Sequence, residues 1–123
     1  MKTSSKKAKG RRLQQLVCKE LVKIGHQFGL TSDDCRSTPM GSCGVDVMLS
    51  SKARRLLDLS IECKNQEHLN VVGEFLKHCE GHRKDRGRKI LVHTKNRTEP
   101  MVTLSLEDFL DMLYVDVYDR VQS

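Results

Sequence analysis

The chain has 123 residues, of which 31% are charged and 37% hydrophobic, and its net charge is +6. These values fit one compact domain with a core of its own and exclude a low-complexity or disordered chain. No apolar run approaches the roughly 18 residues that span a bilayer, and the N-terminus lacks the apolar part of a signal peptide. We therefore expect a cytoplasmic protein that does not contact a membrane.

The basic charge and the cysteines add two expectations. The charge gathers in MKTSSKKAKGRR at the start and in HRKDRGRK over residues 82–89, which favours a polyanionic partner because each neutralised phosphate releases counterions. Aromatic residues make up only 4% of the chain, so a surface for stacking single-stranded bases is not expected. The five cysteines are an odd number without CxxC spacing, which favours reduced thiols over a disulfide framework.

The first predicted element is a helix over residues 10–24, preceded by a flexible basic arm over 1–9. Its apolar positions repeat with helical spacing, at Leu13, Leu16, Val17, Leu21 and Ile24. Gly25 supplies the stop. Glu20 lies near the centre of this stripe, where an unpaired carboxylate is costly to bury. We therefore expect Glu20 to pair with a buried base or to border a cationic site.

Two strands are predicted after a turn-rich loop over 29–43 that leaves room for one short strand. GVDVMLS (44–50) alternates apolar and polar residues, and so does LLDLSIECK (56–64). The polar stretch SSKARR is predicted to be the turn that makes these strands neighbours. Because residues i and i+2 of a strand share a face, Glu62 and Lys64 are expected to stand side by side.

The second half of the chain is predicted to hold a helix over 69–82, strands over 88–94 and 101–106, and a final helix. Ser105 and Asp108 resemble a capping box at the start of that helix. The element order is therefore α-β-β-α-β-β-α. This order is typical of an α/β fold in which helices flank a mixed sheet.

The stretch HCEGH places His78 and His82 at i,i+4 spacing on the predicted helix. A structural zinc site needs four converging ligands, and no second ligand pair accompanies these two. We therefore favour two exposed helical histidines as the interpretation.

Asp46, Glu62 and Lys64 are the residue types that metal-dependent phosphodiester cleavage needs. Carboxylates hold Mg²⁺, which prefers hard oxygen ligands and keeps several waters. A lysine beside them meets the negative charge that develops on the phosphate. Taken alone, the pattern also fits a solvated sheet face with surface ion pairs, and Glu20 would add a third acid.

These features together resemble the PD-(D/E)XK nuclease superfamily, in which a helix with an acid precedes a strand with aspartate, a strand with E-x-K and a further helix. The stretches KGRRLQQLV, RSTPMGSCGVDVMLS, IECKNQE and KNRTEP are similar to short, stand-alone phage-type endonucleases of that superfamily. A more distant similarity is to the archaeal Holliday-junction resolvases. The resemblance runs from about residue 9 to 110 and implies one domain over 10–123 with a restriction-endonuclease-like core.

The resemblance also implies a set of catalytic residues. Asp46 and Glu62 would hold Mg²⁺, for which Mn²⁺ would substitute, and the backbone carbonyl of Cys63 would be a further ligand. Lys64 would be the catalytic lysine. The residue before Asp46 is Val45, where the motif that names the superfamily has proline.

Other positions are implied in the helix and at the DNA. Glu20 would be the acid of the helix, but Gln14 competes with it because similar phage sequences carry a glutamine there. Arg36 also fits an exposed loop arginine, and Gln66 also fits a cap of the following helix. The residues implied to contact DNA are Arg11, Arg12, Gln14, Arg36, Ser37 and Gln66.

The function implied by the resemblance is a Mg²⁺-dependent DNA endonuclease. It would be structure-selective, nicking DNA or resolving junctions as a homodimer in phage DNA metabolism, in the cytoplasm of the host cell. The alternative from another class is a non-catalytic nucleic-acid-binding module that keeps this fold and its basic surface. A nuclease or binding protein directed at RNA is a third interpretation.

Overall fold

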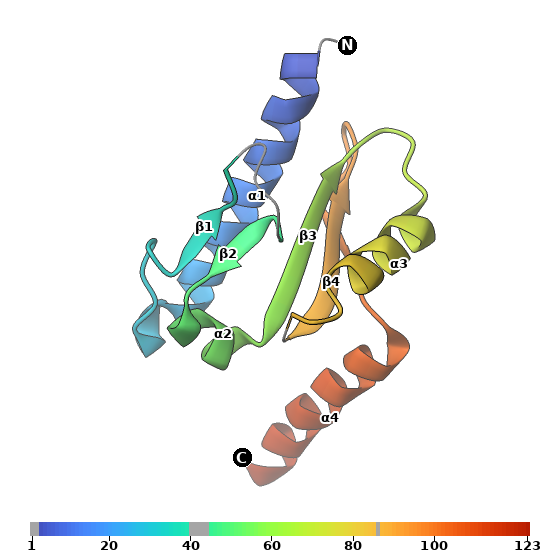
Figure 1. Cartoon of the computed structure of the whole chain (residues 1–123). Helices are drawn as coiled ribbons and strands as arrows, with labels where there is room; N and C mark the ends of the chain where they lie inside the picture. Colours follow the sequence, from blue (N-terminus) through green and yellow to red (C-terminus); the bar gives the residue numbers. More distant parts are fainter. Residues whose placement is uncertain (1–2, 40–44, 86) are drawn as a thin grey trace.

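The computed structural model describes residues 3–39, 45–85 and 87–123, so Cys43 and the end of the predicted loop over 29–43 lie outside the described residues. Helices and strands alternate along most of the chain (Figure 1). Within the described residues their order is α1 (Thr3–Gly25), η1 (His26–Phe28, a 3-10 turn), β1 (Cys35–Ser37), β2 (Val47–Leu49), α2 (Ser51–Leu57), β3 (Leu59–Asn65), α3 (Val71–Gly81), β4 (Arg88–Thr94), β5 (Met101–Thr103) and α4 (Leu106–Gln122).

The N-terminal helix is longer than the sequence predicted. α1 begins at Thr3, so residues 3–9 are helical, where a flexible arm was expected. Lysine and alanine are good helix formers, and they dominate the stretch KKAK over residues 6–9. Apolar periodicity marks only the part of a helix that packs against a core, so it does not detect a polar extension of this kind.

The stretch SSKARR forms a helix, and the prediction of a turn there is wrong. Ser50 caps α2, because its hydroxyl accepts a hydrogen bond from the Ala53 N–H at 3.0 Å. Asp58 then ends the helix in the left-handed conformation, with a φ of 53°, and β3 begins at the next residue. The predicted α/β class is confirmed, but the described residues hold one α-helix more than expected and two separate sheets in place of the one mixed sheet that was predicted.

β3 and β4 form the main pair of strands. They are parallel over their whole length, from Leu59 opposite Arg88 to Asn65 opposite Thr94, and β5 runs antiparallel on the other edge of β4. β1 and β2 form a separate antiparallel pair. A backbone hydrogen bond from the Asp46 N–H to the Ile61 carbonyl, at 3.2 Å, joins this pair to β3. The strands that carry the predicted site are therefore neighbours.

Helices cover both faces of the β3–β4 pair (Figure 1). α1 packs against β1 and β3, whereas α3 packs against β4. The buried residues between α1 and the strands form the core, which contains Leu13, Cys18, Leu30, Cys35, Val47, Ala53, Ile61, Cys63, Ile90 and Val92. Because side chains alternate along a strand, Ile61 and Cys63 enter this core, while Ser60, Glu62 and Lys64 face the other way, toward α3.

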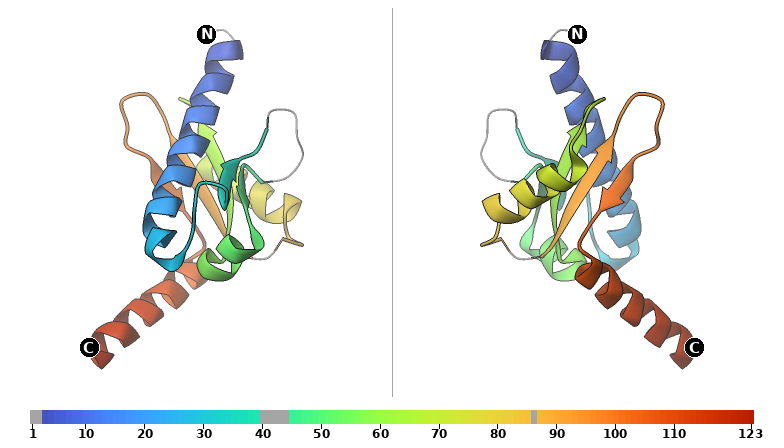
Figure 2. Two further views of the ribbon diagram at one scale, coloured as in Figure 1. Left: turned by 90° about the vertical axis from the view of Figure 1, so that its left-hand side faces the viewer. Right: turned by 90° about the vertical axis from the view of Figure 1, so that its right-hand side faces the viewer.

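α4 projects away from the rest of the molecule (Figures 1 and 2). Its predicted cap is confirmed, because the Ser105 hydroxyl accepts a hydrogen bond from the Asp108 N–H at 3.1 Å. Its large apolar side chains are exposed, namely Leu106, Phe109, Leu110, Met112, Leu113, Tyr114, Val115, Val117, Tyr118 and Val121. Among the described residues, no helix has both the length and the apolar character to cross a membrane.

Candidate functional site

Asp46 is fixed against β3 by its backbone and by its side chain. Its N–H donates to the Ile61 carbonyl, and its Oδ2 accepts a hydrogen bond from the Cys63 N–H at 2.8 Å. The Thr38 N–H donates to the Asp46 carbonyl at 2.9 Å. The N–H and C=O of one strand residue point to the same edge, so the Cys63 carbonyl also faces the edge where Asp46 lies. The carboxylate therefore has a defined position beside a backbone oxygen.

The Glu62 carboxyl group lies beside that of Asp46. It is 19% exposed, and its pKa is raised from the usual 4.5 to about 8, with burial as the largest cause. A hydrogen bond to Asp46 and the negative charge of Asp46 are the next largest causes of this rise. Two carboxyl groups in such surroundings share a proton or bind a cation, because they cannot both ionise without a compensating charge.

Lys64 brings positive charge to the same face. Its ammonium group lowers the Glu62 pKa, although burial and Asp46 outweigh this effect. The Lys64 Nζ also lies 3.8 Å from an Oε of Glu74 on α3, and both side chains are partly buried. The structure thus brings together the three side chains that the sequence placed in one site, Asp46, Glu62 and Lys64.

Glu74 and His78 also belong to this cluster, although neither was predicted to lie in it. The negative charge of Glu74 raises the Glu62 pKa, and the His78 Nδ1 lies 3.6 Å from a Glu62 Oε. The signal was present in the sequence, because Glu74, His78 and His82 are spaced by four residues. This spacing places them on one stripe of the helix.

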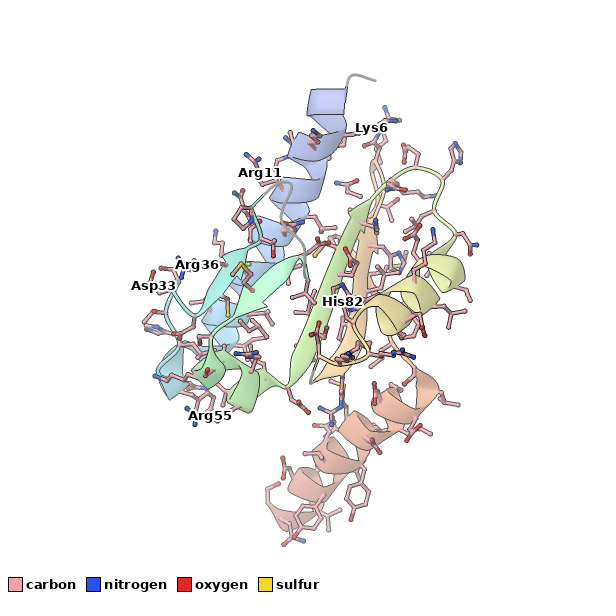
Figure 3. The ribbon with its side chains drawn as sticks, in the orientation of Figure 1. Lys6, Arg11, Asp33, Arg36, Arg55 and His82 are labelled. Carbon is pink, nitrogen blue, oxygen red and sulfur yellow. The ribbon has the colours of Figure 1, made fainter. Side chains whose placement is uncertain are left out.

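His78 is buried, so the expectation of two exposed histidines is wrong. Its Nε2 lies 2.9 Å from the Ser60 carbonyl oxygen, which fixes the imidazole between α3 and β3. Burial lowers the His78 pKa, so the ring is neutral near pH 7 and makes no ion pair with Glu62. Figure 3 places His82 beside the strands at the end of α3, and its side chain is 20% exposed. Apolar periodicity alone did not reveal that α3 turns these polar side chains toward the sheet.

Glu20 lies outside the cluster, and the expectation that it faces the core or a cleft is wrong. Its side chain is 52% exposed and pairs with Lys23 at 3.2 Å. The buried apolar side chains on the described part of α1 are Leu13 and Cys18, with Val17, Leu21 and Val22 packed against the same core. At about 100° per residue, this set is centred near residue 14. Leu16 and Ile24, which had placed the centre near Glu20, are exposed.

Gln14 therefore occupies the inward position on α1. Its side-chain oxygen accepts a hydrogen bond from the Ser37 hydroxyl at 2.5 Å, and both residues are partly buried. Ser37 lies opposite Val47 on β2, close to Asp46 in the chain. The Ser37 hydroxyl, which was predicted to hold a phosphate, thus contacts Gln14. Gln14 is the alternative to Glu20 as the residue that α1 contributes to the site.

The remaining residues predicted to contact DNA are exposed. Arg11 and Arg12 lie on α1, Arg36 lies on β1, and Figure 3 shows Arg11 and Arg36 on one side of the molecule. Gln66 is exposed at the end of β3, where its N–H donates to the Thr94 carbonyl at 3.1 Å. The alternative that Gln66 caps the next helix is wrong, because Asn70 caps α3.

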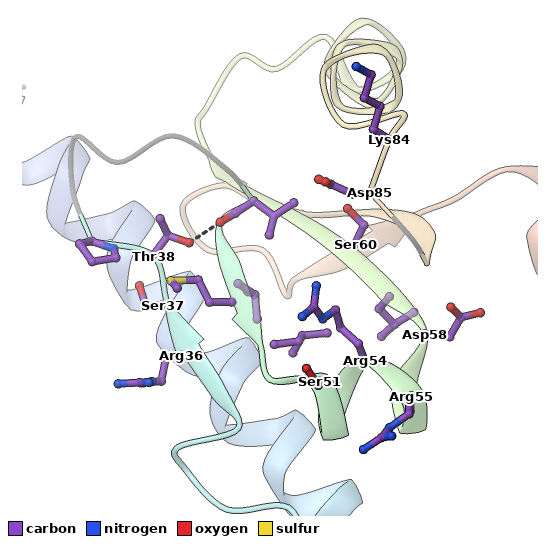
Figure 4. Close-up of a pocket in the computed structure, with 16 residues that line it drawn as sticks. Arg36, Ser37, Thr38, Ser51, Arg54, Arg55, Asp58, Ser60, Lys84 and Asp85 are labelled. Carbon is purple, nitrogen blue, oxygen red and sulfur yellow. Dashed lines mark hydrogen bonds between the residues drawn. The ribbon is translucent and has the colours of Figure 1, made fainter.

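A groove borders the site between the β1–β2 pair, α2 and the turn after α3 (Figure 4). Val45, the neighbour of Asp46, and Ser60, which shares a strand face with Glu62, are among the residues that line it. Arg54 points toward the middle of the groove, whereas Arg36 points outward. The positively charged residues among the described lining are Arg36, Arg54, Arg55 and Lys84, and the negatively charged ones are Asp58 and Asp85.

Comparisons with protein-family models, with curated proteins and with solved structures found no match to this chain. The function therefore has to be inferred from the geometry of the site itself. The cluster contains two adjacent carboxyl groups, of Asp46 and Glu62, and the ammonium group of Lys64. A groove lined by more basic than acidic residues lies next to it.

Proposed function

We propose that this chain is a divalent-metal-dependent nuclease that hydrolyses phosphodiester bonds in DNA. The observation that carries the proposal is the pairing of the Asp46 and Glu62 carboxyl groups, with Lys64 on the same strand face. Two ionised carboxylates at this separation repel each other, and a bound divalent cation would offset that repulsion. The order of α1, the aspartate before β2, and E-x-K on β3 supports a restriction-endonuclease-like core.

The oxygen ligands available fit Mg²⁺, with Mn²⁺ as a substitute. Asp46 and Glu62 supply carboxylate oxygens, and the Cys63 carbonyl lies on the same strand edge as Asp46. A bound Mg²⁺ supplies a water of lowered pKa and a Lewis acid for the phosphate. Glu74 holds Lys64 at 3.8 Å within the cluster, where its ammonium group would orient the water and offset charge on the phosphate.

DNA is the proposed polyanion, and the groove of Figure 4 supports this choice. Its arginines line the groove together with Val45, the chain neighbour of Asp46, so a phosphate backbone following the groove would pass close to the cluster. Such contacts read the shape of the backbone and carry no base sequence, which supports selectivity for DNA structure, including branched DNA. A role in phage DNA metabolism within a host cytoplasm rests on the sequence resemblance alone.

We further propose that the chain acts as a homodimer through α4. Leu106, Leu110, Leu113 and Val117 are spaced by four, three and four residues, and all four are exposed. This spacing forms the apolar seam by which one helix packs against another of the same kind. A second copy of α4 would cover the seam and place two sites in one assembly, as cleavage of two strands requires.

The test is cleavage of linear, nicked and branched DNA by the purified chain with Mg²⁺, Mn²⁺ or EDTA. We expect cutting that depends on the metal and that Lys64→Ala reduces by at least about 100-fold. Lys77→Ala is the matched control, because Lys77 also pairs with Glu74, at 3.7 Å, but is 78% exposed. Binding without cutting in any metal would overturn the proposal in favour of a binding module, and cleavage of matched RNA alone would redirect it to RNA.

A further inference from the structure

We propose that Glu62, His78 and His82 form a second cation site, which takes a divalent transition metal such as Zn²⁺ in preference to Mg²⁺. Each residue offers one ligand atom, and the three atoms lie within 4.8 Å of one another. One carboxylate and two imidazoles are a ligand set that suits zinc and leaves a fourth position open. Mg²⁺ prefers oxygen ligands throughout, so this site differs in chemistry from the Asp46–Glu62 pair.

The hydrogen bond of His78 leaves a lone pair directed at the site. The Ser60 carbonyl can only accept, so the Nε2 at 2.9 Å carries the proton and donates it. In the neutral ring, Nδ1 is then an unprotonated acceptor. This Nδ1 is buried and has no hydrogen-bond partner among the described residues, and it lies 3.6 Å from a Glu62 Oε. Two electron-rich atoms facing each other in a buried place need a proton or a cation between them.

His82 has the same arrangement of a ligand and its supporting group. Its Nδ1 lies 2.9 Å from an Oδ of Asp85, so this nitrogen donates to the carboxylate and Nε2 is free to bind a metal. Metal-binding histidines usually donate their other N–H to a carboxylate or a backbone carbonyl, which fixes the tautomer and raises the basicity of the ligand. His78 with Ser60 and His82 with Asp85 supply one partner of each kind.

Small movements would bring the three ligands to bonding distance. Ligand atoms around a tetrahedral zinc lie about 3.4 Å apart, somewhat closer than the 4.8 Å limit seen here. His82 can close this gap, because it follows the last residue of α3 and its ring centroid already lies 5.1 Å from that of His78. His78 and Glu62 are held by α3 and β3, so the movement is confined to one side chain.

Glu62 belongs to both proposed sites, which makes them competitors. A metal held by the two histidines would occupy the Glu62 carboxylate, which would then not be available to a cation at Asp46. If the proposed nuclease function holds, Zn²⁺ is then expected to inhibit cleavage that depends on Mg²⁺. This consequence rests on the proposed function, whereas the binding of Zn²⁺ does not.

Binding of Zn²⁺ to the full chain, measured by titration calorimetry, tests the proposal without reference to activity. We expect one Zn²⁺ per chain, with affinity lowered at least about 10-fold in His82→Ala and in Glu62→Gln. His68→Ala is the matched control, because His68 is exposed and lies outside the cluster. The Zn²⁺ affinity of this variant should stay within about twofold of the wild-type value. Asp46→Asn should bind Zn²⁺ at least as tightly as the wild type, because it removes a charge that favours the protonated form of Glu62, although it disrupts the proposed Mg²⁺ site.

The absorption spectrum of the Co²⁺-loaded chain identifies the ligand atoms. Nitrogen and oxygen ligands are expected to give visible bands without the intense ultraviolet charge-transfer band of a thiolate. Either of two results would overturn the proposal. One is wild-type affinity for Zn²⁺ in both His82→Ala and Glu62→Gln, and the other is a thiolate band showing that the cysteines hold the metal.

Discussion

The Cys63 N–H donates a hydrogen bond to the Asp46 carboxylate at 2.8 Å, so the backbone of β3 positions the aspartate that directly precedes β2. This bond predicts different effects for two substitutions. Asp46→Asn keeps an oxygen acceptor, whereas Asp46→Ala leaves a partly buried N–H without a partner. We expect Asp46→Ala to cost about 1–3 kcal/mol of unfolding free energy and Asp46→Asn clearly less, as measured by urea unfolding. Equal losses in both variants would mean that the bond does not stabilise the fold.

The raised pKa of Glu62 predicts how stability depends on pH in the absence of metal. The folded chain holds this proton more tightly than the unfolded chain, because burial and Asp46 raise the pKa from 4.5 to about 8. The favourable contribution is therefore complete below about pH 4.5 and is lost as the pH rises through about 8.

Glu62→Gln removes this titration and keeps a donor for Asp46. With EDTA present, we expect the variant to be about 1–2 kcal/mol more stable than the wild type at pH 9. The difference should shrink toward pH 5, and urea unfolding at several pH values measures it. A difference that does not change with pH would contradict the assigned pKa.

The two strands that carry the site, β2 and β3, were predictable because the sequence signals for them are local. Alternation around Asp46 and along LLDLSIECK indicates two strands, and E-x-K spacing places Glu62 and Lys64 on one face. Convergence with Asp46 then needed only that the two strands be adjacent. That condition holds even though the connection is a helix, because the Asp46 N–H reaches the Ile61 carbonyl.

The residues that α1 and α3 contribute to the site were harder to predict, because they depend on which face of each helix packs against the strands. Leu16 and Ile24 extend the apolar stripe of α1 in the sequence but are exposed in the fold, so the stripe shifts from Glu20 toward Gln14. His78 is buried because it reaches the Ser60 carbonyl, a long-range partner that periodicity does not reveal. Tertiary contacts of this kind decide which polar residues enter a site.

The two candidates for the helix position, Gln14 and Glu20, can now be separated. Gln14→Ala removes the acceptor of the Ser37 hydroxyl, so we expect a loss of about 1 kcal/mol in unfolding free energy. Glu20→Ala breaks only an exposed pair with Lys23, so its change should stay within about 0.5 kcal/mol. If the proposed function holds, cleavage should also fall in the first variant and not in the second. A larger loss of stability and cleavage in Glu20→Ala than in Gln14→Ala would indicate that Glu20 belongs to the site.

The basic groove predicts a strong dependence of DNA binding on salt. The logarithm of the binding constant should fall linearly with the logarithm of salt concentration, as fluorescence anisotropy can measure. Arg54→Ala should lower the magnitude of the slope by about 1, because Arg54 points into the groove. Arg120→Ala is the control, since Arg120 lies on α4 and pairs with Asp116 at 2.8 Å. A nearly flat wild-type plot would contradict a phosphate footprint in the groove.

The exposed seam of α4 predicts that self-association depends on one face of that helix. Leu113 lies within the seam, whereas Val115 lies on the opposite side at about 100° per residue, and both are exposed. Leu113→Glu would place a carboxylate in the interface between two copies, so we expect the dissociation constant to rise at least about 100-fold. Val115→Glu makes the same chemical change on the far side and should leave the dimer intact. Sedimentation equilibrium over a range of protein concentrations separates the two variants, and a wild-type chain that stays monomeric at about 100 μM would remove α4 as the dimer interface.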